Sequence, residues 1–173
     1  MSRIDVSRWI PVGLVGTPKG LRGALRLRPH NVAIASLRAG VAVRVSREGL
    51  GTRSFEVASF VRDGSGWTLN LATVVDRTGA EALVGAEVAV RRGDLPPLGE
   101  GEYYHCDVPG CVVYDAAGER VGEVLRVIAY PSVDALLVRT ADGEVEVPVT
   151  EVHVASLDVA AGVVRLADGA AAE

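Results

Sequence analysis

Apolar and polar residues alternate in short runs along most of this chain, and no other feature of the sequence limits the fold as strongly. Successive side chains of a strand point to opposite faces of a sheet, so alternation predicts strands that bury one face. In the run LRGALRLR, the leucines would face the core and the arginines the solvent. These residues are Leu21, Leu25 and Leu27 on one face and Arg22, Arg26 and Arg28 on the other. Further strands are expected at 41–45, 55–59, 67–71, 86–90, 111–115, 121–130, 135–140, 144–149 and 163–168.

Turn signals separate these runs at the spacing of a small β-barrel. RDGSGW at 62–67, DAAGER at 115–120 and ADGEV at 141–145 carry the Asp and Gly residues typical of hairpins. One short helix is expected at 78–85, where Thr78 and Glu81 have capping-box spacing and Gly85 could end it. Many short strands with almost no helix predict an all-β protein.

The charge of the chain divides it into two halves. Residues 1–97 carry 14 Lys and Arg against 8 Asp and Glu, a net charge of +6, whereas residues 98–173 carry 4 against 14, a net charge of −10. The sign changes at a segment rich in Pro and Gly, which is typical of a linker. We therefore expect two small barrels, at 8–93 and 102–168, joined by a linker at 94–101 and followed by a disordered tail at 169–173.

The glycine-rich opening, VGLVGTPKGLRGALRLRP, could hold a nucleotide phosphate or present positive charge to a larger anion. A P-loop needs Gly-Lys-Ser/Thr opening a helix, but Lys19 precedes Gly20 and a strand pattern follows. The expected RNA-contacting residues are Lys19, Arg22, Arg26 and Arg28, and the motif loop consists of Gly16, Gly20, Leu21 and Gly23. Four cations on one face repel one another unless an anion screens them, and an RNA backbone would do so. The alternative is a merely solvated basic face.

The sequence offers no metal site and no catalytic site. Cys106 and Cys111 lack a second pair of ligands at short spacing, and His105 would point away from Cys106 on a strand. Buried small hydrophobes are the favoured interpretation of both cysteines. We expect no cofactor, no metal, no catalytic residue and no membrane span, and a cytoplasmic location.

Two adjacent tyrosines, Tyr103 and Tyr104, follow the expected linker in the motif GEYYHCD. On a strand, one ring would pack inward and the other would be exposed. Exposed tyrosine is enriched at protein interfaces, which suggests a binding role. The alternative is that both rings pack in the core or against the linker.

Three segments together resemble the RimM family of ribosome maturation factors. They are the glycine-rich opening, the segment GEYYHCDVPGCVVYDAAGERVGEV at 101–124, and the closing runs DALLVRTADGEVEVPV and EVHVASLDVAAGVVRL. The resemblance implies a translation-factor-like N-terminal barrel and a C-terminal PRC barrel. It also implies a non-catalytic assembly factor that binds the head of the immature small ribosomal subunit and aids 16S rRNA processing.

The partners implied by this resemblance are 16S rRNA, the small-subunit precursor and small-subunit ribosomal protein nineteen. Tyr103 and Tyr104 would contribute to subunit binding, and we expect the factor to act as a monomer. Ala24 departs from the acidic residue often found in the family, which leaves the strand more positive. Two alternatives remain at this point: a PRC-barrel scaffold without an RNA role, and an rRNA-processing nuclease.

Overall fold

The computed structural model describes residues 4–30, 35–64, 66–99 and 101–169. The chain divides into two compact units: the first is Val6–Pro97, and the second runs from Leu98 onward and also includes residues 4 and 5. The division coincides with the change of charge sign in the sequence, so the first unit is basic and the second is acidic. Each unit is built almost entirely from strands, which confirms the prediction of an all-β protein.

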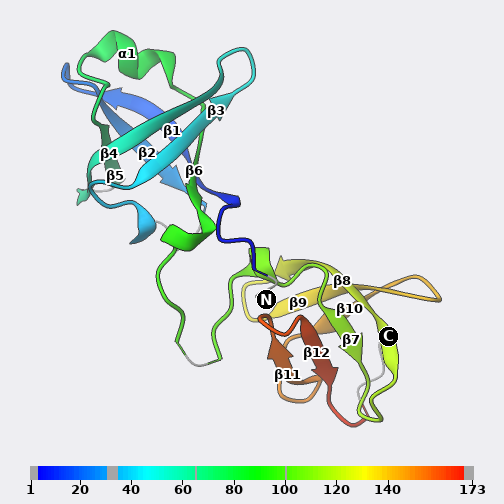
Figure 1. Cartoon of the computed structure of the whole chain (residues 1–173). Helices are drawn as coiled ribbons and strands as arrows, with labels where there is room; N and C mark the ends of the chain where they lie inside the picture. Colours follow the sequence, from blue (N-terminus) through cyan, green and yellow to red (C-terminus); the bar gives the residue numbers. More distant parts are fainter. Residues whose placement is uncertain (1–3, 31–34, 65, 100, 170–173) are drawn as a thin grey trace. The chain divides into compact units, whose positions relative to one another are not determined.

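The first unit is a closed barrel of six strands in the order β1-β2-β5-β4-β3-β6 (Figure 1). Its strands are β1 (Trp9–Lys19), β2 (Ala24–Pro29), β3 (Ala42–Arg47), β4 (Gly51–Asp63), β5 (Gly66–Leu71) and β6 (Glu87–Arg91). All six neighbouring pairs are antiparallel. A short 3₁₀ turn, η2 (Arg92–Asp94), follows the last strand. Closure leaves no strand edge unpaired and so fixes the position of every strand face.

Alternation along these strands fills the barrel with aliphatic side chains. Leu25 and Leu27 on β2 are buried, and the arginines between and after them face outward. Val43 and Val45 on β3 follow the same pattern. Each fully buried Val or Leu side chain contributes about 1.5–3 kcal/mol through the hydrophobic effect. The strands predicted at 41–45, 55–59, 67–71 and 86–90 are therefore confirmed.

The one α-helix among the described residues, α1 (Arg77–Ala82), begins one residue earlier than predicted and has a different cap. Asp76, rather than Thr78, is the N-cap residue, and its side chain accepts a hydrogen bond of 2.7 Å from the Gly79 amide. The capping-box interpretation of Thr78 and Glu81 was wrong. Glu81 instead pairs with Arg77 one helical turn away, with 2.7 Å between Oε1 and Nε.

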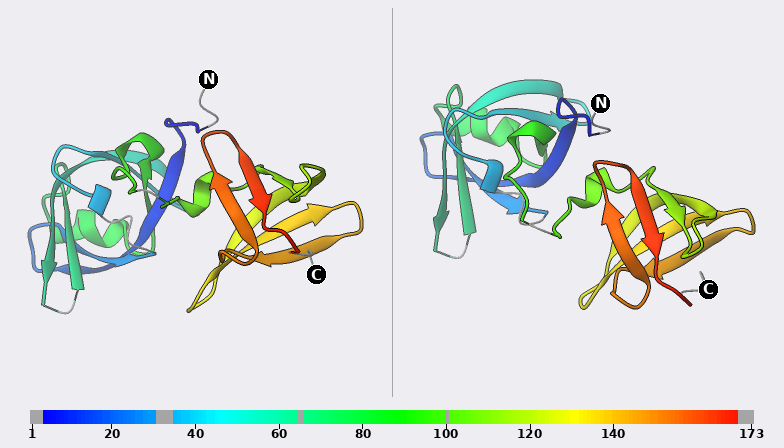
Figure 2. Two further views of the ribbon diagram at one scale, coloured as in Figure 1. Left: turned by 90° about the horizontal axis from the view of Figure 1, so that it is seen from below. Right: turned by 60° about the horizontal axis from the view of Figure 1, so that its bottom comes forward.

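The second unit is a curled sheet of six strands in the order β10-β9-β8-β7-β12-β11 (Figure 2). Its elements are η3 (His105–Asp107), β7 (Val112–Tyr114), β8 (Arg120–Ala129), β9 (Asp134–Thr140), β10 (Glu144–Pro148), β11 (Val154–Asp158) and β12 (Val163–Leu166). The hairpins predicted at 115–120 and 141–145 are confirmed as the β7–β8 and β9–β10 connections. Strand β12 returns to pair in parallel with β7, which brings the last strands of the chain beside the first strand of the unit.

The inner face of this sheet encloses a separate core. Val113, Val124, Leu136 and Val138 are almost fully buried, and Cys111 lies among them. The interpretation of Cys111 as a buried small hydrophobe is therefore confirmed, whereas Cys106 is only half-buried. Each unit thus has its own hydrophobic core.

Candidate functional site

The basic segment forms a hairpin whose turn depends on two glycines. Gly20 and Gly23 both have positive φ, at +67° and +79°, a conformation that L side chains rarely adopt. Gly23 also lies against the loop before α1, where a Cβ would come within 2.1 Å of the Val74 carbonyl oxygen. Gly16, by contrast, lies within strand β1 and not in the loop, and a Cβ there would lie 3.3 Å from Arg26.

Leu21 and Arg22 occupy the turn itself, and this overturns the prediction that strand alternation begins at Leu21. Leu21 is 75% exposed, whereas Leu25 and Leu27 are buried as expected. The backbone bends at Gly20 and Gly23, so the two-residue period of β2 starts only at Ala24. Leu21 therefore lies at the surface beside Arg22, an apolar side chain within a basic loop.

Two of the four expected RNA-contacting cations pair with a carboxylate of the same unit on its outer surface. Asp63, at the end of β4, makes an ion pair with Lys19 and lies 3.8 Å from an Arg26 guanidinium nitrogen. Arg26 also donates to the Asp63 carbonyl oxygen at 3.2 Å. The expectation that an external anion must screen all four cations was therefore too strong, because the protein supplies one carboxylate of its own.

Arg22 and Arg28 differ from this pair. Both are exposed, and within the described residues neither makes an ion pair or a hydrogen bond. Arg22 lies in the turn and Arg28 near the end of β2. They are the cations of the hairpin that are free to meet an anion from outside.

The tyrosine pair is not on a strand. Tyr103 and Tyr104 lie in extended chain immediately before η3, and Tyr104 is the residue that precedes its first turn. Both side chains are half-buried, so the expectation of one buried and one exposed ring was wrong. Tyr103 packs against the core of the second unit, which agrees in part with the alternative that the pair has a packing role.

Sequence reasoning missed a polar cluster that holds this segment. The Asp134 carboxylate, at the start of β9, accepts a hydrogen bond of 3.0 Å from the Tyr103 hydroxyl. The same oxygen lies 2.7 Å from Nε2 of His105. Burial, together with the hydrogen bond and negative charge of Asp134, raises the pKa of the Tyr103 phenol above its usual value. Asp134 is 31 positions from Tyr103 and 29 from His105 in the sequence, so no local pattern could have predicted that they meet.

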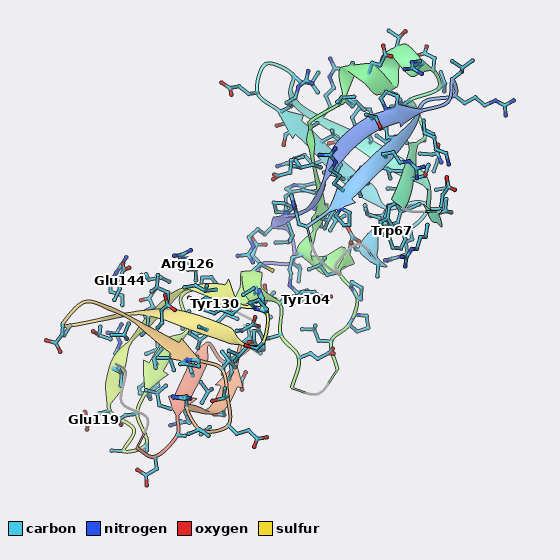
Figure 3. The ribbon with its side chains drawn as sticks, turned by 180° about the vertical axis from the view of Figure 1, so that it is seen from behind. Trp67, Tyr104, Glu119, Arg126, Tyr130 and Glu144 are labelled. Carbon is cyan, nitrogen blue, oxygen red and sulfur yellow. The ribbon has the colours of Figure 1, made fainter. Side chains whose placement is uncertain are left out.

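The outer face of the second sheet carries alternating charges next to an exposed aromatic ring. Arg126, Leu137 and Glu146 lie opposite one another on β8, β9 and β10. Tyr130, which follows β8, is 47% exposed, and its hydroxyl donates a hydrogen bond of 2.8 Å to Glu146. Figure 3 labels Arg126, Tyr130 and Glu144 on this part of the unit. The face combines a polar rim with a fixed tyrosine, a composition common in protein interfaces.

Within the part of the chain that the structure describes, no three His, Cys, Asp or Glu side chains gather as a metal site would require. Among the same residues, no helix is long and apolar enough to cross a membrane.

The fold and surface define a class of protein: two all-β units, a basic closed barrel and an acidic curled sheet. Family models match both units, the RimM N-terminal domain at residues 10–95 and the RimM PRC barrel domain at residues 105–168. The chain therefore belongs to the RimM family. Its second unit is the PRC barrel that the resemblance implied.

Two relatives in sequence support this assignment, and one solved structure is similar over most of the chain. The chain is 37% identical over 161 residues to the ribosome maturation factor RimM of Sorangium cellulosum, covering 92% of this chain and 95% of that protein. It is 39% identical over 132 residues to the protein of the same name from Thermus thermophilus, covering 76% of each. A crystal structure of RimM from Pseudomonas aeruginosa aligns over 92% of this chain and 96% of its own, with 23% identity and a TM-score of 0.47.

Proposed function

We propose that this chain is a ribosome assembly factor that binds the immature small ribosomal subunit at its head and aids 16S rRNA maturation without catalysing a reaction. Its relatives are named ribosome maturation factors, which supports a role in building the ribosome. The observation that carries the RNA-binding part is the hairpin of the barrel, with Arg22 and Arg28 exposed and unpaired within the described residues.

In this proposal, the barrel contacts rRNA phosphates. Arg22 and Arg28 make the direct contacts, because binding an anion there requires no internal ion pair to break. Lys19 and Arg26 contribute more weakly, since Asp63 already neutralises part of their charge. Each phosphate contact releases condensed counterions, so affinity should fall steeply as salt rises.

The second unit would bind a basic ribosomal protein, for which small-subunit protein nineteen is our candidate. Its half of the chain has a net charge of −10, which would attract a cationic partner and orient it. Tyr103 and Tyr104 would contribute to subunit binding from a segment held by Asp134. The factor would act as a monomer in the cytoplasm, and would favour one conformation of the forming head over another.

The RNA contact is tested by measuring affinity for 16S rRNA over a range of salt concentrations. Arg22→Ala with Arg28→Ala should weaken binding about 10-fold or more. The slope of log affinity against log salt concentration should fall by the amount expected for the loss of about two phosphate contacts. The control, Arg38→Ala with Arg53→Ala, removes the same net charge from exposed positions of the same unit that lie outside the hairpin. Equal affinities of the two double variants would refute a contact through the hairpin.

The tyrosine role is tested by co-sedimentation with immature small subunits. Tyr103→Ala with Tyr104→Ala should reduce sedimentation with the subunit, whereas Tyr114→Ala, on β7, serves as a control for loss of an aromatic ring. Circular dichroism verifies that each variant is folded. Unchanged co-sedimentation of a folded double variant would show that the tyrosines are packing residues only. Cleavage of precursor RNA by the purified protein, dependent on a divalent metal, would favour the nuclease alternative.

A further inference from the structure

A second cationic feature of the barrel lies on strands β1, β3 and β6, away from the hairpin turn. The guanidinium carbon of Arg44 lies 4.5 Å from the centre of the Trp9 ring, and that of Arg91 lies 5.2 Å from it. Two guanidinium groups therefore share a single indole. An aromatic ring attracts each cation through its quadrupole but does not neutralise its charge.

The strand register explains why these three side chains meet. Trp9 on β1 lies opposite Arg91 on β6, and Arg44 on β3 lies opposite Ala89 on β6. All of these residues face outward, because Val88 and Val90 on β6 point into the core. Ala89 is a small residue and is only 8% exposed, so the long Arg44 side chain can cross over it toward the indole. Strands β1, β6 and β3 are consecutive in the barrel, as Figure 1 shows.

Neither arginine has an acidic partner within the described residues. Two carboxylates lie diagonally from Arg44 in register, those of Glu56 on β4 and Glu87 on β6, and neither pairs with Arg44 or Arg91. Glu87 is on the same face of β6, but it lies four residues from Arg91 and its oxygen is 4.0 Å from His30. Arg91 is exposed, while Arg44 and Trp9 are half-buried. The pair is thus a concentration of positive charge open to solvent on one side.

We propose that Trp9, Arg44 and Arg91 form a phosphate-binding site, called here the indole–arginine site, which takes a phosphodiester of the RNA backbone. The proposal rests on the RNA-binding function argued above and adds a second contact to it. A guanidinium presents several donors in a planar fork that matches two phosphate oxygens. Packing on the indole restrains both side chains before binding, which lowers the entropic cost of ordering them.

The position of the site extends the RNA-binding surface along the barrel. Trp9 is the first residue of β1, and Lys19 beside the hairpin turn is the last. They are ten positions apart along the strand, equivalent to up to about 33 Å of extended chain. An RNA strand that contacts both ends would be aligned along β1. A single cluster of cations would leave the RNA free to rotate about that one contact.

A fluorescence experiment reports on the site directly in the full-length chain. The protein contains two tryptophans, so Trp67→Phe leaves Trp9 as the single reporter. The substitution keeps an aromatic ring against Phe60, on which Trp67 is stacked. Short single-stranded RNA should change the Trp9 emission saturably, and added salt should reverse the change. Inorganic phosphate in its place tests whether a free anion suffices. RNA binding detected by a dye on the RNA, with unchanged Trp9 emission, would overturn the proposal.

Substitutions then separate this site from the hairpin. Arg44→Met with Arg91→Met keeps aliphatic packing on the indole but removes both charges. It should weaken RNA binding about 5- to 10-fold and lower the slope of log affinity against log salt concentration by about 1–2. The control, Arg38→Met with Arg53→Met, should have a much smaller effect. Thermal unfolding verifies that the double variants are folded, and Arg44→Lys with Arg91→Lys should restore part of the affinity.

The outcomes distinguish the site from the function on which it rests. If Arg22→Met with Arg28→Met weakens binding but the Arg44 and Arg91 variant matches the control, the indole–arginine site is wrong and RNA binding by the hairpin stands. If the native chain binds no RNA in dilute salt, the proposed function fails and the site fails with it. If both pairs weaken binding and Trp9 emission responds, the site is established.

Discussion

The two candidate surfaces of this protein are held in place by different means. In the barrel, the hairpin turn is fixed by backbone conformation, because Gly20 and Gly23 have positive φ and Gly23 lies against the Val74 carbonyl. In the second unit, the tyrosine segment has no strand pairing and is held by side chains, through the shared acceptor Asp134. The hairpin turn should therefore be sensitive to substitutions that restrict its backbone. The tyrosine segment should be sensitive to substitutions that remove the side-chain hydrogen bonds.

The two surfaces also differ in how their charges are paired. In the hairpin, Asp63 pairs with Lys19 and lies near Arg26, whereas Arg22 and Arg28 are unpaired within the described residues. The outer face of the second sheet alternates charges, with Arg139 on β9 opposite Glu123 and Glu144 on its neighbours. A partner of the barrel would therefore meet concentrated positive charge, and a partner of the sheet would meet a mixed surface within an acidic unit.

The largest effect is expected from adding a single methyl group to Gly23. Gly23→Ala places a Cβ 2.1 Å from the Val74 oxygen at a φ of +79°, and should cost about 3 kcal/mol of unfolding free energy. Gly20→Ala has a similar φ but open space, and should cost about 1 kcal/mol. Chemical denaturation measures both. Equal losses would show that the Val74 loop moves away without cost.

A Gly→Ala substitution in the second unit measures the effect of steric crowding without backbone strain. Gly122 on β8 does not have a positive φ, but a Cβ there would lie 2.2 Å from the Arg139 carbonyl oxygen. Gly122→Ala should therefore cost about 1–3 kcal/mol through crowding alone. A denaturation midpoint equal to that of the native chain would mean that strands β8 and β9 can separate locally.

Loss of the shared acceptor should weaken the second unit and leave the barrel unchanged. Asp134→Ala leaves the Tyr103 hydroxyl without its hydrogen-bond partner and should cost about 1–2 kcal/mol. Asp142→Ala, in the exposed β9–β10 turn, removes the same charge and should change stability by less than about 0.5 kcal/mol. If the two variants unfold at the same denaturant concentration, the cluster contributes nothing to holding the segment.

Removal of the internal carboxylate should strengthen RNA binding by the barrel. Asp63→Asn frees Lys19 and Arg26, and should raise the affinity for 16S rRNA about 3-fold at low salt. Glu48→Gln changes the net charge equally in an exposed turn and should have a smaller effect. Affinity that rises equally in both variants would show that only the net charge of the barrel matters.

The smallest effect concerns the ionisation of Tyr103. Because burial and Asp134 raise the pKa of its phenol above 10.0, this tyrosine should ionise above that pH in an alkaline titration followed by tyrosinate absorbance. The folded state favours the neutral phenol, so its stabilising contribution is complete below pH 10 and declines as the pH rises through the raised pKa. Tyr103→Phe should remove the part of the absorbance change that occurs above the ordinary tyrosine pKa. An absorbance change of the same size in this range would show that Tyr103 does not cause it.

Much of the barrel could be predicted because its signals are local. The alternation of Leu25 with Arg26 and Leu27 defines both faces of β2 without reference to any other strand. The start of that alternation could not be predicted, because the bend at Gly23 depends on the Val74 loop 51 residues further along the chain. The capping error at α1 has a simpler cause, since both Asp76 and Thr78 are favourable N-cap residues.

The candidate sites were harder to predict because they are assembled across strands. Asp63 meets Lys19, and Asp134 meets Tyr103, only after register brings distant segments together. The outward direction of Arg44 could be inferred from Val43 and Val45 on either side of it. Its meeting with Trp9 could not, because it requires the order β3-β6-β1 in the closed barrel.

The central claim is that the basic unit binds RNA and the acidic unit does not. The most direct measurement expresses residues 6–97 and 98–173 separately, establishes by circular dichroism that each is folded, and titrates each with naked 16S rRNA in dilute salt. We expect the first fragment to bind, with an affinity that falls steeply as salt is added, and the second to show no binding. Binding by the second fragment alone, or by neither folded fragment, would contradict the claim.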